Sequence, residues 1–512
     1  MVLKTLNFND VNSKVMVVGR MALHITPGMT DKEFLEKEIK KWFKSQARFD
    51  QIKGEAYYDG KHEILHRKRY VLDDNGNKKV EENLPNNKII DNQFAEAVDK
   101  KANYLCGKPF VIDTENKVLG AALNKMCNEK IYALIRIVAE KSLTGGKSWV
   151  FPYYNDSGKL CFELFPAHEV LPFWADDLHT ELDCAAHIYP VMVYDNQGKE
   201  TIVFKVEILH GGGIDRFEWD ENKEKLKVDD DVPSGAYLKI RDPETGEEIK
   251  YNWERIPLIC FKYNHREIPL IKRVKCLQDA LNLLLSDFVN NMSEDIHSTI
   301  LVIHNYDGED LSKFRSNLAT YGAIKVKSVD GVKGGVDTLR IDVNSENYKI
   351  IVTLLKDAII ENARSYNAKD DRMNGNPNQM NIRSMYSDID LDANGMETLF
   401  KSAMQELLWF IKVDIANKTK NKSILDEDVT IIFDRDIIVN ETEVIDNFVN
   451  MGGRISNETL IKNHPWISDP EDEIQRLKKE EEAEQAKADP YQNAYVSSAK
   501  QRKDDKGGDV DE

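Results

Sequence analysis

The chain has 512 residues, 41% of them hydrophobic, and its 88 acidic and 70 basic residues give a formal net charge of −18 at pH 7. This length predicts a folded protein with a sizeable core, divided among roughly two to four domains. The acidic balance argues against a protein that grips nucleic acid through a strongly basic surface. No apolar run reaches the roughly 18 residues that a membrane-spanning helix needs, and no signal-peptide pattern is present, so we expect an intracellular protein.

Helices are predicted to dominate the N-terminal region. Thr30 and Glu33 form a capping box, in which each side chain satisfies a backbone amide, ahead of one amphipathic helix over residues 31–58. The sequence DDNG at residues 73–76 predicts a hairpin turn between two short strands. Three further helices are predicted, at residues 91–106, 115–127 and 129–143.

Residues 149–263 change to a period of two, which is typical of half-buried strands. Three pairs of such segments are separated by the turn-forming sequences NDSG, DNQG and DENKE, and each pair predicts an antiparallel hairpin. The region ends in the apolar strand IPLICFKY. Helices that lead into an antiparallel sheet predict an α+β fold.

Two amphipathic helices follow, over residues 269–296 and 345–368, and their apolar residues recur at intervals of three and four. They enclose a small insert, residues 298–344, which we expect to form a strand, a helix over residues 307–321 and a hairpin of two strands. Because both ends of the insert meet at the tips of the two helices, it is predicted to project as a docking surface.

Three cations crowd the first turn of the helix over residues 269–296, where the helix dipole disfavours positive charge. They are Lys272, Arg273 and Lys275. An acidic neighbour or a DNA phosphate would explain their position, and solvated surface side chains are the simpler alternative.

The next segment is the polar sequence KDDRMNGNPNQMNIR, residues 369–383. It holds four Asn, one Gly and one Pro and almost nothing that could be buried, so we expect an exposed and mobile loop. A long helix over residues 384–420 follows, with a bend expected at Gly395. Beyond it the sequence predicts a strand over residues 429–433, short helices, and an acidic tail that is disordered from about residue 489.

Motifs for catalysis are weak. The sequence LTGGKS, residues 143–148, ends like a phosphate-binding P-loop, but Lys141 stands where the first glycine is required. The carboxylate groups around Asp388, Asp426 and Asp434 suit helix caps or solvated faces better than a two-metal site. We therefore predict no catalytic residue, no metal site and no cofactor. The six cysteines lack a C-x-x-C pair and predict reduced structural thiols.

Several local sequences, taken in their order along the chain, resemble the portal proteins of tailed double-stranded DNA bacteriophages of the siphophage type. The resemblance covers nearly the whole chain up to about residue 465. It includes the paired helices around residues 369–383. The other matching sequences are YYDGKHEIL (57–65), NNKIIDNQFAEAVDKKANYLCGKPF (86–110), FPAHEVLPFW (165–174) and IPLICFKYNHREIPLIKRVKCLQDALN (256–282).

The resemblance implies a portal-protein fold with a helical and antiparallel-sheet wing, a two-helix stem, a small α/β clip, a long wing spine helix and a helical crown. Each part is expected to be one continuous stretch of the chain. The wing is the exception, because the spine helix and strand over residues 384–454 are expected to complete it. The implied parts are the wing (1–268), stem helix 1 (269–297), the clip (298–344), stem helix 2 (345–368), the tunnel loop (369–383), the wing spine helix and strand (384–454), the crown (455–488) and a disordered acidic tail (489–512).

The resemblance also implies a structural role in the virion rather than an enzymatic one. Such a protein forms a ring, a dodecamer in the family, at one capsid vertex, through which DNA is packaged and later ejected. The implied partners are further copies of the chain, weakly and non-specifically held double-stranded DNA, the terminase large subunit, a head-completion or tail adaptor protein, and the major capsid and scaffolding proteins. Assembly would take place in the host cytoplasm, without a membrane.

The DNA-facing residues that the resemblance implies lie in the tunnel loop. Their amide and cationic side chains would make weak, exchangeable contacts with phosphates, as sliding DNA requires. A net negative charge is compatible with a conduit that DNA passes without adhering. The implied residues are Lys369, Arg372, Asn374, Asn376, Asn378, Gln379, Asn381 and Arg383.

Two alternatives remain open from the sequence. One is a metal-dependent nucleic-acid enzyme that uses Asp clusters such as those at Asp388 and Asp434. The other is a different head-tail adaptor that lacks a DNA-facing loop.

Overall fold

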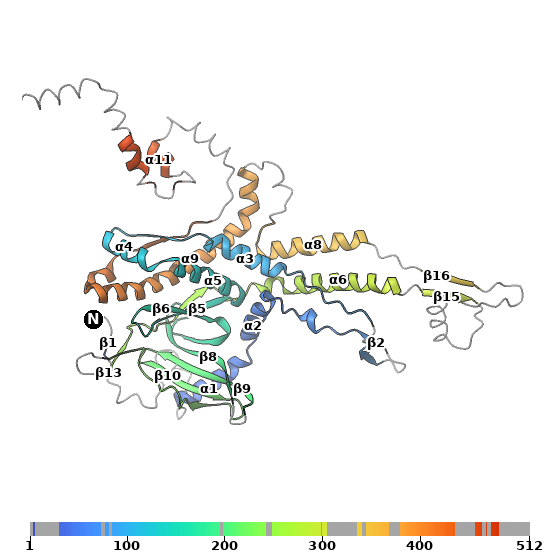
Figure 1. Cartoon of the computed structure of the whole chain (residues 1–512), viewed down its shortest axis with the longest axis horizontal. Coiled ribbons are helices and arrows are strands. Elements are labelled where there is room, and N and C mark those ends of the chain that lie inside the picture. The colour runs from blue at the N-terminus through green and yellow to red at the C-terminus, as the bar shows by residue number, and fades with distance from the viewer. Residues whose placement is uncertain are drawn as a thin grey trace, which may run out of the picture. The chain divides into compact units, whose positions relative to one another are not determined.

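The computed structural model describes residues 4–5, 30–72, 77–80, 84–194, 198–241, 248–297, 300–304, 335–339, 345–367, 379–435, 456–462, 467, 470 and 473–480. The chain divides into two compact units, Met1–Ala368 with Met385–Ile437, and Lys369–Ser384 with Ile438–Glu512. The first unit combines helices with antiparallel sheets (Figure 1), which confirms the predicted α+β class. Within the described ranges, no helix is both long and apolar enough to cross a membrane.

Two helices form at the N-terminal end where one was predicted. α1 (Asp31–Phe43) begins at the predicted capping box, in which the Glu33 amide donates to the Thr30 hydroxyl and the Thr30 amide donates to the Glu33 carboxylate. The chain breaks after α1 because the Ser45 hydroxyl accepts a backbone amide of α2 (Gln46–Tyr58) and so caps a new helix. The prediction of one continuous helix was therefore wrong, because Ser45 caps a second helix within the predicted range.

The three predicted hairpins are confirmed as β5–β6, β8–β9 and β10–β11. A five-stranded sheet has the order β11-β10-β9-β8-β7, and a three-stranded sheet has the order β14-β5-β6. α1 contributes Leu35 and Ile39 to a core shared with Ile188 and Val206 of the larger sheet. The strands are β5 (Lys147–Tyr154), β6 (Leu160–Pro166), β7 (Val170–Trp174), β8 (Leu182–Tyr194), β9 (Glu200–His210), β10 (Gly213–Asp220), β11 (Lys225–Val228) and β14 (Ile259–Lys262).

Shorter strands pair in small sheets. In the insert predicted between the paired helices, β15 and β16 are antiparallel with Ile300 opposite Leu339, whereas the predicted helix over residues 307–321 lies outside the described residues. The small sheets join β1 (Lys4–Thr5), β13 (Glu248–Asn252) and β12 (Leu238–Arg241); β2 (Tyr70–Leu72) and β3 (Lys78–Val80); β4 (Val111–Asp113) and β17 (Thr430–Ile432); and β15 (Ile300–His304) and β16 (Gly335–Leu339).

The main core lies where helices meet the three-stranded sheet. Phe400 of α9 packs edge-on against Phe261 of β14, with ring centroids 5.2 Å apart. All six cysteines carry free thiols, as predicted. The remaining helices are α3 (Gln93–Cys106), α4 (Lys117–Met126), α5 (Glu129–Gly145), α6 (Ile271–His297), α8 (Ser345–Ala363), α9 (Gln379–Thr419), α11 (Asn457–Lys462) and the short helices η3 (Glu63–His66), η4 (Ala167–Glu169) and η6 (Lys422–Asp426).

α6 and α8 lie side by side and extend away from the sheets of the first unit (Figure 1). The ring of Phe288 on α6 contacts that of Tyr348 on α8, with centroids 4.7 Å apart. The first half of the apolar stripe predicted on α8 is uncovered, because Ile350, Ile351 and Leu354 are 57%, 44% and 62% exposed, whereas Ile359 near its end is buried. One neighbouring helix cannot cover the whole stripe of another, so a single chain leaves part of α8 open.

α9 begins earlier than the predicted helix over residues 384–420. Its first residue is Gln379, so Gln379, Asn381 and Arg383 are helical and do not belong to a loop. Proline is tolerated before a helix or in its first turn but not in its interior, and Pro377 is the last proline before this helix. The predicted loop, residues 369–383, is therefore five residues too long, because residues 379–383 belong to α9.

Gly395→Ala should raise the free energy of unfolding by about 0.5–1 kcal/mol, because alanine loses less backbone entropy than glycine when a helix forms. A methyl group at Gly395 would meet nothing within 4 Å. As a control, Gly54→Ala should lower the free energy of unfolding by about 1–3 kcal/mol, since its Cβ would lie 2.0 Å from the Thr144 carbonyl oxygen. Urea unfolding of the purified variants measures both changes, and a destabilised Gly395→Ala protein would contradict a regular helix at this residue.

Candidate functional site at the base of α6 and α8

The predicted tunnel-loop residues divide into two groups. Gln379, Asn381 and Arg383 lie in the first turns of α9. The others lie outside the described residues, so their proposed contact with DNA stays a prediction: Lys369, Arg372, Asn374, Asn376 and Asn378.

The cations in the first turn of α6 have protein carboxylates as neighbours. Lys272 Nζ lies 2.8 Å from an oxygen of Asp50. Lys275 Nζ lies 2.6 Å from Asp279 and 3.0 Å from Glu63. Burial opposes the charge on Lys275, but hydrogen bonds to these two carboxylates outweigh it and raise the pKa of the ammonium. Of the explanations offered by the sequence, the acidic neighbour is the one that the structure shows.

The third of these cations, Arg273, contributes to a cluster around Asp392. Lys101 Nζ and the Tyr263 hydroxyl each donate to Asp392 Oδ2 at 2.7 Å. Guanidinium nitrogens of Arg364 and Arg273 lie 3.3 and 3.6 Å from Oδ1. Burial raises the pKa of Asp392, but the surrounding cations, Lys101 first, lower it overall, while burial lowers the pKa of Lys101 to about 8.

The Asp392 cluster joins five segments of the first unit. Lys101 belongs to α3, Tyr263 follows β14, Arg273 is in the first turn of α6, and Arg364 follows α8 with a left-handed φ of 51°. Asp392 itself lies on α9. The cluster therefore fixes the point from which both paired helices leave the rest of the unit.

A second buried ion cluster surrounds Glu267, just before α6. Its carboxylate lies 2.5 Å from Lys147 Nζ, 2.7 Å from His179 Nδ1 and 3.1 Å from Lys262 Nζ. Burial raises the pKa of Glu267, but the charge of Lys147 and the hydrogen bonds from Lys147 and His179 lower it to about 2. The Glu267 carboxylate is thus charged at neutral pH and ties β5, β14 and the loop after β7 together.

A row of polar residues along α6 is the feature that sequence analysis missed. Gln278, Asn282, Ser286 and Asn290 are fully buried although none is apolar. They accept hydrogen bonds at 2.7–3.1 Å from backbone amides of residues 87–94, which comprise an extended segment and the start of α3. The four donors are Asn87, Ile89, Asp91 and Phe94.

The spacing explains why this extended segment fits the helix. Four residues of an α-helix rise about 6 Å, and two residues of an extended chain span about 6.6 Å. Side chains at every fourth position of α6 therefore accept hydrogen bonds from every second amide of residues 87–91. They take the place of the carbonyl groups that a neighbouring strand would offer. Uncharged polar residues at strict four-residue spacing along an amphipathic helix were the available signal.

His62, one of two histidines four residues apart, belongs to the same polar row. Asn282 Nδ2 donates to His62 Nδ1 at 2.8 Å, and the other ring nitrogen lies 3.0 Å from the Tyr57 carbonyl oxygen. Burial lowers the pKa of His62. Its role is structural, because both ring nitrogens are engaged within the chain.

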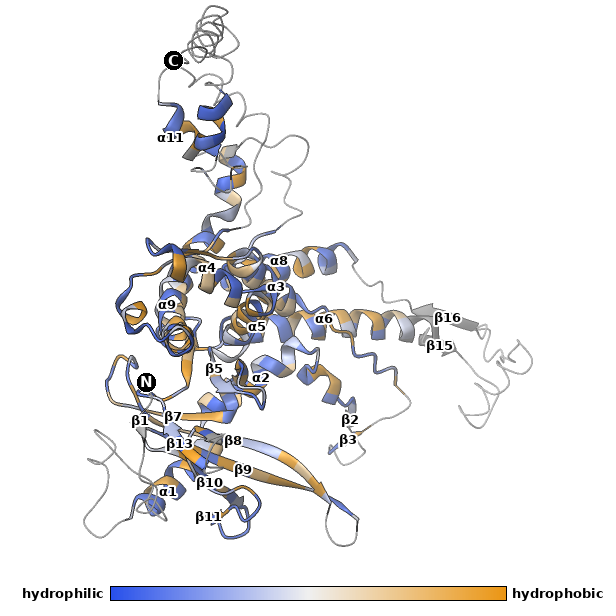
Figure 2. Ribbon diagram, turned by 60° about the vertical axis from the view of Figure 1, so that its left-hand side comes forward, coloured by the Kyte–Doolittle hydropathy of each residue, from blue (hydrophilic) through white to orange (hydrophobic). Residues whose placement is uncertain are grey.

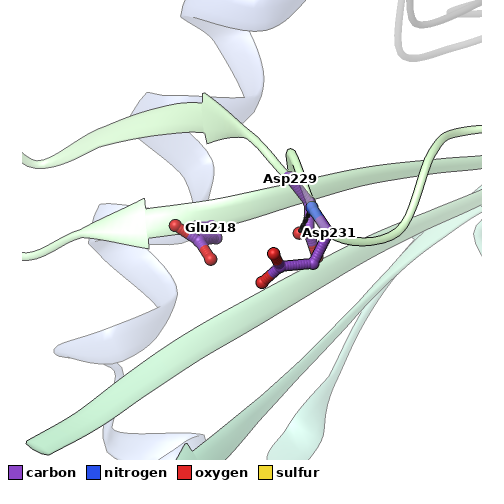
Figure 3. A group of neighbouring side chains, drawn as sticks. All are labelled: Glu218, Asp229 and Asp231. Carbon is purple, nitrogen blue, oxygen red and sulfur yellow. Dashed lines mark hydrogen bonds between the residues drawn. The ribbon is translucent and has the colours of Figure 1, made fainter. Parts of the chain in front are cut away.

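The Asp388 group, considered from the sequence for metal chemistry, contains carboxylates that pair with cations and one that is exposed to solvent. Asp390 pairs with Arg435, and Asp388 is exposed. In the described part of the chain, one group of three carboxylates could hold a metal ion: Glu218, Asp229 and Asp231 (Figure 3). Lys205 Nζ lies 2.8, 3.0 and 3.6 Å from them. An ammonium group therefore already lies among these carboxylates and offsets part of their charge.

Comparison with known proteins gives consistent matches over most of the chain. Residues 40–487 match the family model described as "Phage portal protein, SPP1 Gp6-like". The portal protein of Bacillus phage SPP1 is 25% identical over 469 residues, 90% of this chain and 87% of that protein. The portal protein of Clostridium phage phiCD119 is 24% identical over 468 residues, 86% of this chain and 95% of that protein.

A solved structure is also similar. It is titled "Neck of native GTA particle computed with C12 symmetry", and the match covers 71% of this chain and 87% of that chain. The TM-score is 0.34 and the sequence identity is 11%.

Asn282→Ala should lower the free energy of unfolding by about 2–4 kcal/mol, because the Asp91 amide, the Gln278 amide and His62 would each lose a buried partner. Hydrogen exchange at the Asp91 amide should accelerate in the same variant. Cys276→Ala, at an exposed position of the same helix, is the control and should change stability by less than about 0.5 kcal/mol. Unaltered exchange at Asp91 in Asn282→Ala would show that the polar row does not hold this segment.

Proposed function

The chain belongs to the SPP1 Gp6-like family of phage portal proteins, and on that premise we propose that its copies form a closed ring through which double-stranded DNA passes. Members of this family are structural components of the virion at a capsid vertex, and not enzymes. The proposal rests above all on the family match over residues 40–487, because it includes both paired helices and the segment between α8 and α9.

Exposed apolar surface supports assembly into an oligomer. Ile350 and Leu354 on α8 and Met292 on α6 are each at least half exposed. The β8–β9 hairpin is hydrophobic along much of its length (Figure 2). Near its far end it exposes Met192 and Ile202, which are paired across the two strands. A neighbouring copy in a closed ring would cover surfaces of this kind, since rings repeat one heterologous contact around an axis.

The proposed ring assigns a place to each segment. Residues 369–378, which connect α8 and α9 in the sequence, would face DNA and make weak contacts through Asn side chains, Lys369 and Arg372. The net charge of −18 keeps such contacts from becoming tight. The proposed parts are the wing (1–268 and 384–454), the stem (269–297 and 345–368), the clip (298–344), the crown (455–488) and the acidic tail (489–512).

The proposed partners follow from these places. The clip, to which β15 and β16 belong, would dock the terminase large subunit during packaging and a head-completion or tail adaptor protein afterwards. The wing would contact the major capsid and scaffolding proteins as the particle assembles in the host cytoplasm. Twelvefold symmetry, the rule in this family, is the ring size that we propose.

A metal-dependent enzyme, the main alternative from the sequence, finds no supporting group among the residues that the structure describes. Asp388 and Asp434 are exposed, and neither belongs to the group of three neighbouring carboxylates found in the described residues. That group contacts Lys205.

Replacement of residues 369–378 by a Gly-Ser linker of equal length should leave ring assembly intact and sharply reduce the yield of DNA-filled capsids, because the contacts that face DNA would be lost. Ring formation is followed by electron microscopy and packaged DNA by nuclease protection. The same replacement at residues 242–247 serves as the control. Normal DNA filling with the altered loop would overturn its proposed role.

The double substitution Ile350→Glu and Leu354→Glu should prevent ring formation without unfolding the chain, because both side chains are exposed in the single subunit and covered in the proposed ring. Analytical ultracentrifugation gives the oligomeric state and circular dichroism the folded state. Ser345→Glu places a negative charge on the opposite side of α8, at an exposed residue, and should assemble normally. A ring of normal size from the double variant would exclude this face from the subunit contact.

A further inference from the structure

A cavity of about 590 Å³ lies between the three-stranded and the five-stranded sheet, at a place that the proposed passage of DNA does not use. β5 and β6 line one side of it, and β8, β9 and β10 line the other. Half of its lining residues carry an aromatic or imidazole ring, and three are glutamates. The wall is therefore both aromatic and acidic.

Five of the rings form one stacked column along the cavity wall. In order they are Tyr153, Phe151, Phe165, His187 and Tyr189, with successive centroids 6.4, 5.5, 3.7 and 4.6 Å apart and interplanar angles of 25° or less. Alternate residues of a strand point to the same side, which places two rings from β5 and two from β8 in the column. Each inner ring has a neighbouring ring on either side in this order, so the two end rings are those with a side open to another group.

The two ends of the column differ in charge. At the Tyr189 end the chain provides its own cations, because Lys205 is the cross-strand partner of Tyr189 and Arg216 lies nearby, 2.9 Å from Glu207. At the Tyr153 end, desolvation and then the groups of Cys161 and Glu163 raise the pKa of the phenol, and no cation is among the causes. Tyr153 is 36% exposed, so this end is open.

The cavity also contains polar groups that the chain leaves without partners. The Glu163 carboxylate is exposed and forms no hydrogen bond or ion pair with a described residue. The Glu169 carboxylate lies 3.6 Å from His187 Nε2 and 4.0 Å from His168 Nε2. His187 is 6% exposed, and its Nε2 has no hydrogen-bond partner and lies 3.6 Å from an oxygen of Glu169. The indole N–H of Trp253, which is 2% exposed, is likewise without a partner. Buried groups such as these two ring nitrogens of His187 and Trp253 cost free energy until something hydrogen-bonds to them.

The geometry points to a binding site for the guanidinium group of an arginine side chain, presented by another polypeptide, at the Tyr153 end of this cavity. A guanidinium is planar, stacks on aromatic faces and donates hydrogen bonds in a fork that matches a carboxylate. Tyr153 supplies an exposed ring and Glu163 an exposed carboxylate with no cationic partner among the described residues. A compact ammonium group would match this planar arrangement less well, and an anion would be repelled by the glutamates.

A polypeptide fits the cavity better than a free cation does. A cation offers only donors, whereas the Trp253 indole N–H needs an acceptor, and a peptide carbonyl provides one. The cavity volume of about 590 Å³ exceeds the space that one guanidinium fills and accommodates the flanking main chain as well.

Ligand-observed NMR on the purified full-length chain tests this site with three probes: N-acetylarginine amide, N-acetylcitrulline amide and a blocked Gly-Arg-Gly tripeptide. Citrulline has the length and planarity of arginine but no charge, so it should bind at least about tenfold more weakly. The tripeptide should bind more tightly than the single arginine if the natural ligand is a polypeptide. Neither comparison depends on ring assembly or on DNA.

Glu163→Gln should weaken binding of N-acetylarginine amide by about five- to tenfold, because the charge-assisted hydrogen bonds are lost. Glu221→Gln, an exposed carboxylate in the turn between β10 and β11, is the matched control and should leave the affinity unchanged. Equal affinity for arginine and citrulline, or an unchanged affinity in Glu163→Gln, would overturn the site. A tripeptide that binds less tightly than the single arginine would overturn its assignment to a polypeptide ligand.

Discussion

The ion pair between Asp392 and Lys101 holds the centre of the first unit together. Both side chains are nearly fully buried, at 9% and 4% exposure, and removing each ion from water costs on the order of several kcal/mol unless partners replace the lost hydration. Asp392 obtains these partners from Tyr263, Arg273 and Arg364 as well as Lys101. Because Arg273 lies in the first turn of α6 and Arg364 follows α8, one carboxylate connects both paired helices to the body.

α6 and α8 are held to different extents. α6 contacts residues 87–94 through its buried polar row and contacts α8 through residues such as Phe288. α8 has α6 as its main neighbour and leaves Ile350 and Leu354 exposed. A rigid first helix and an incompletely covered second one agree with the proposed ring, in which the next subunit supplies the missing contact.

Local signals in the sequence predicted local structure well. The capping box at Thr30, the three hairpins and the amphipathic helices all depend on residues that are close together in the chain, and the structure confirms them. The failures were also local in origin. Ser45 was not recognised as a cap, and the polar residues 379–383 were assigned to a loop because composition alone does not separate an exposed helical turn from a loop.

The sequence by itself determined the α+β class, the order of helices and strands, and the resemblance to phage portal proteins, because these follow from periodicity, turn chemistry and the order of local sequences. Only the tertiary structure decided which charges meet. The partners of Asp392 and of the α6 polar row are separated by up to about 290 positions along the chain, as Lys101 is from Asp392. Periodicity reports which face of an element is apolar but not which distant element covers it, so these contacts emerge only once the chain is folded.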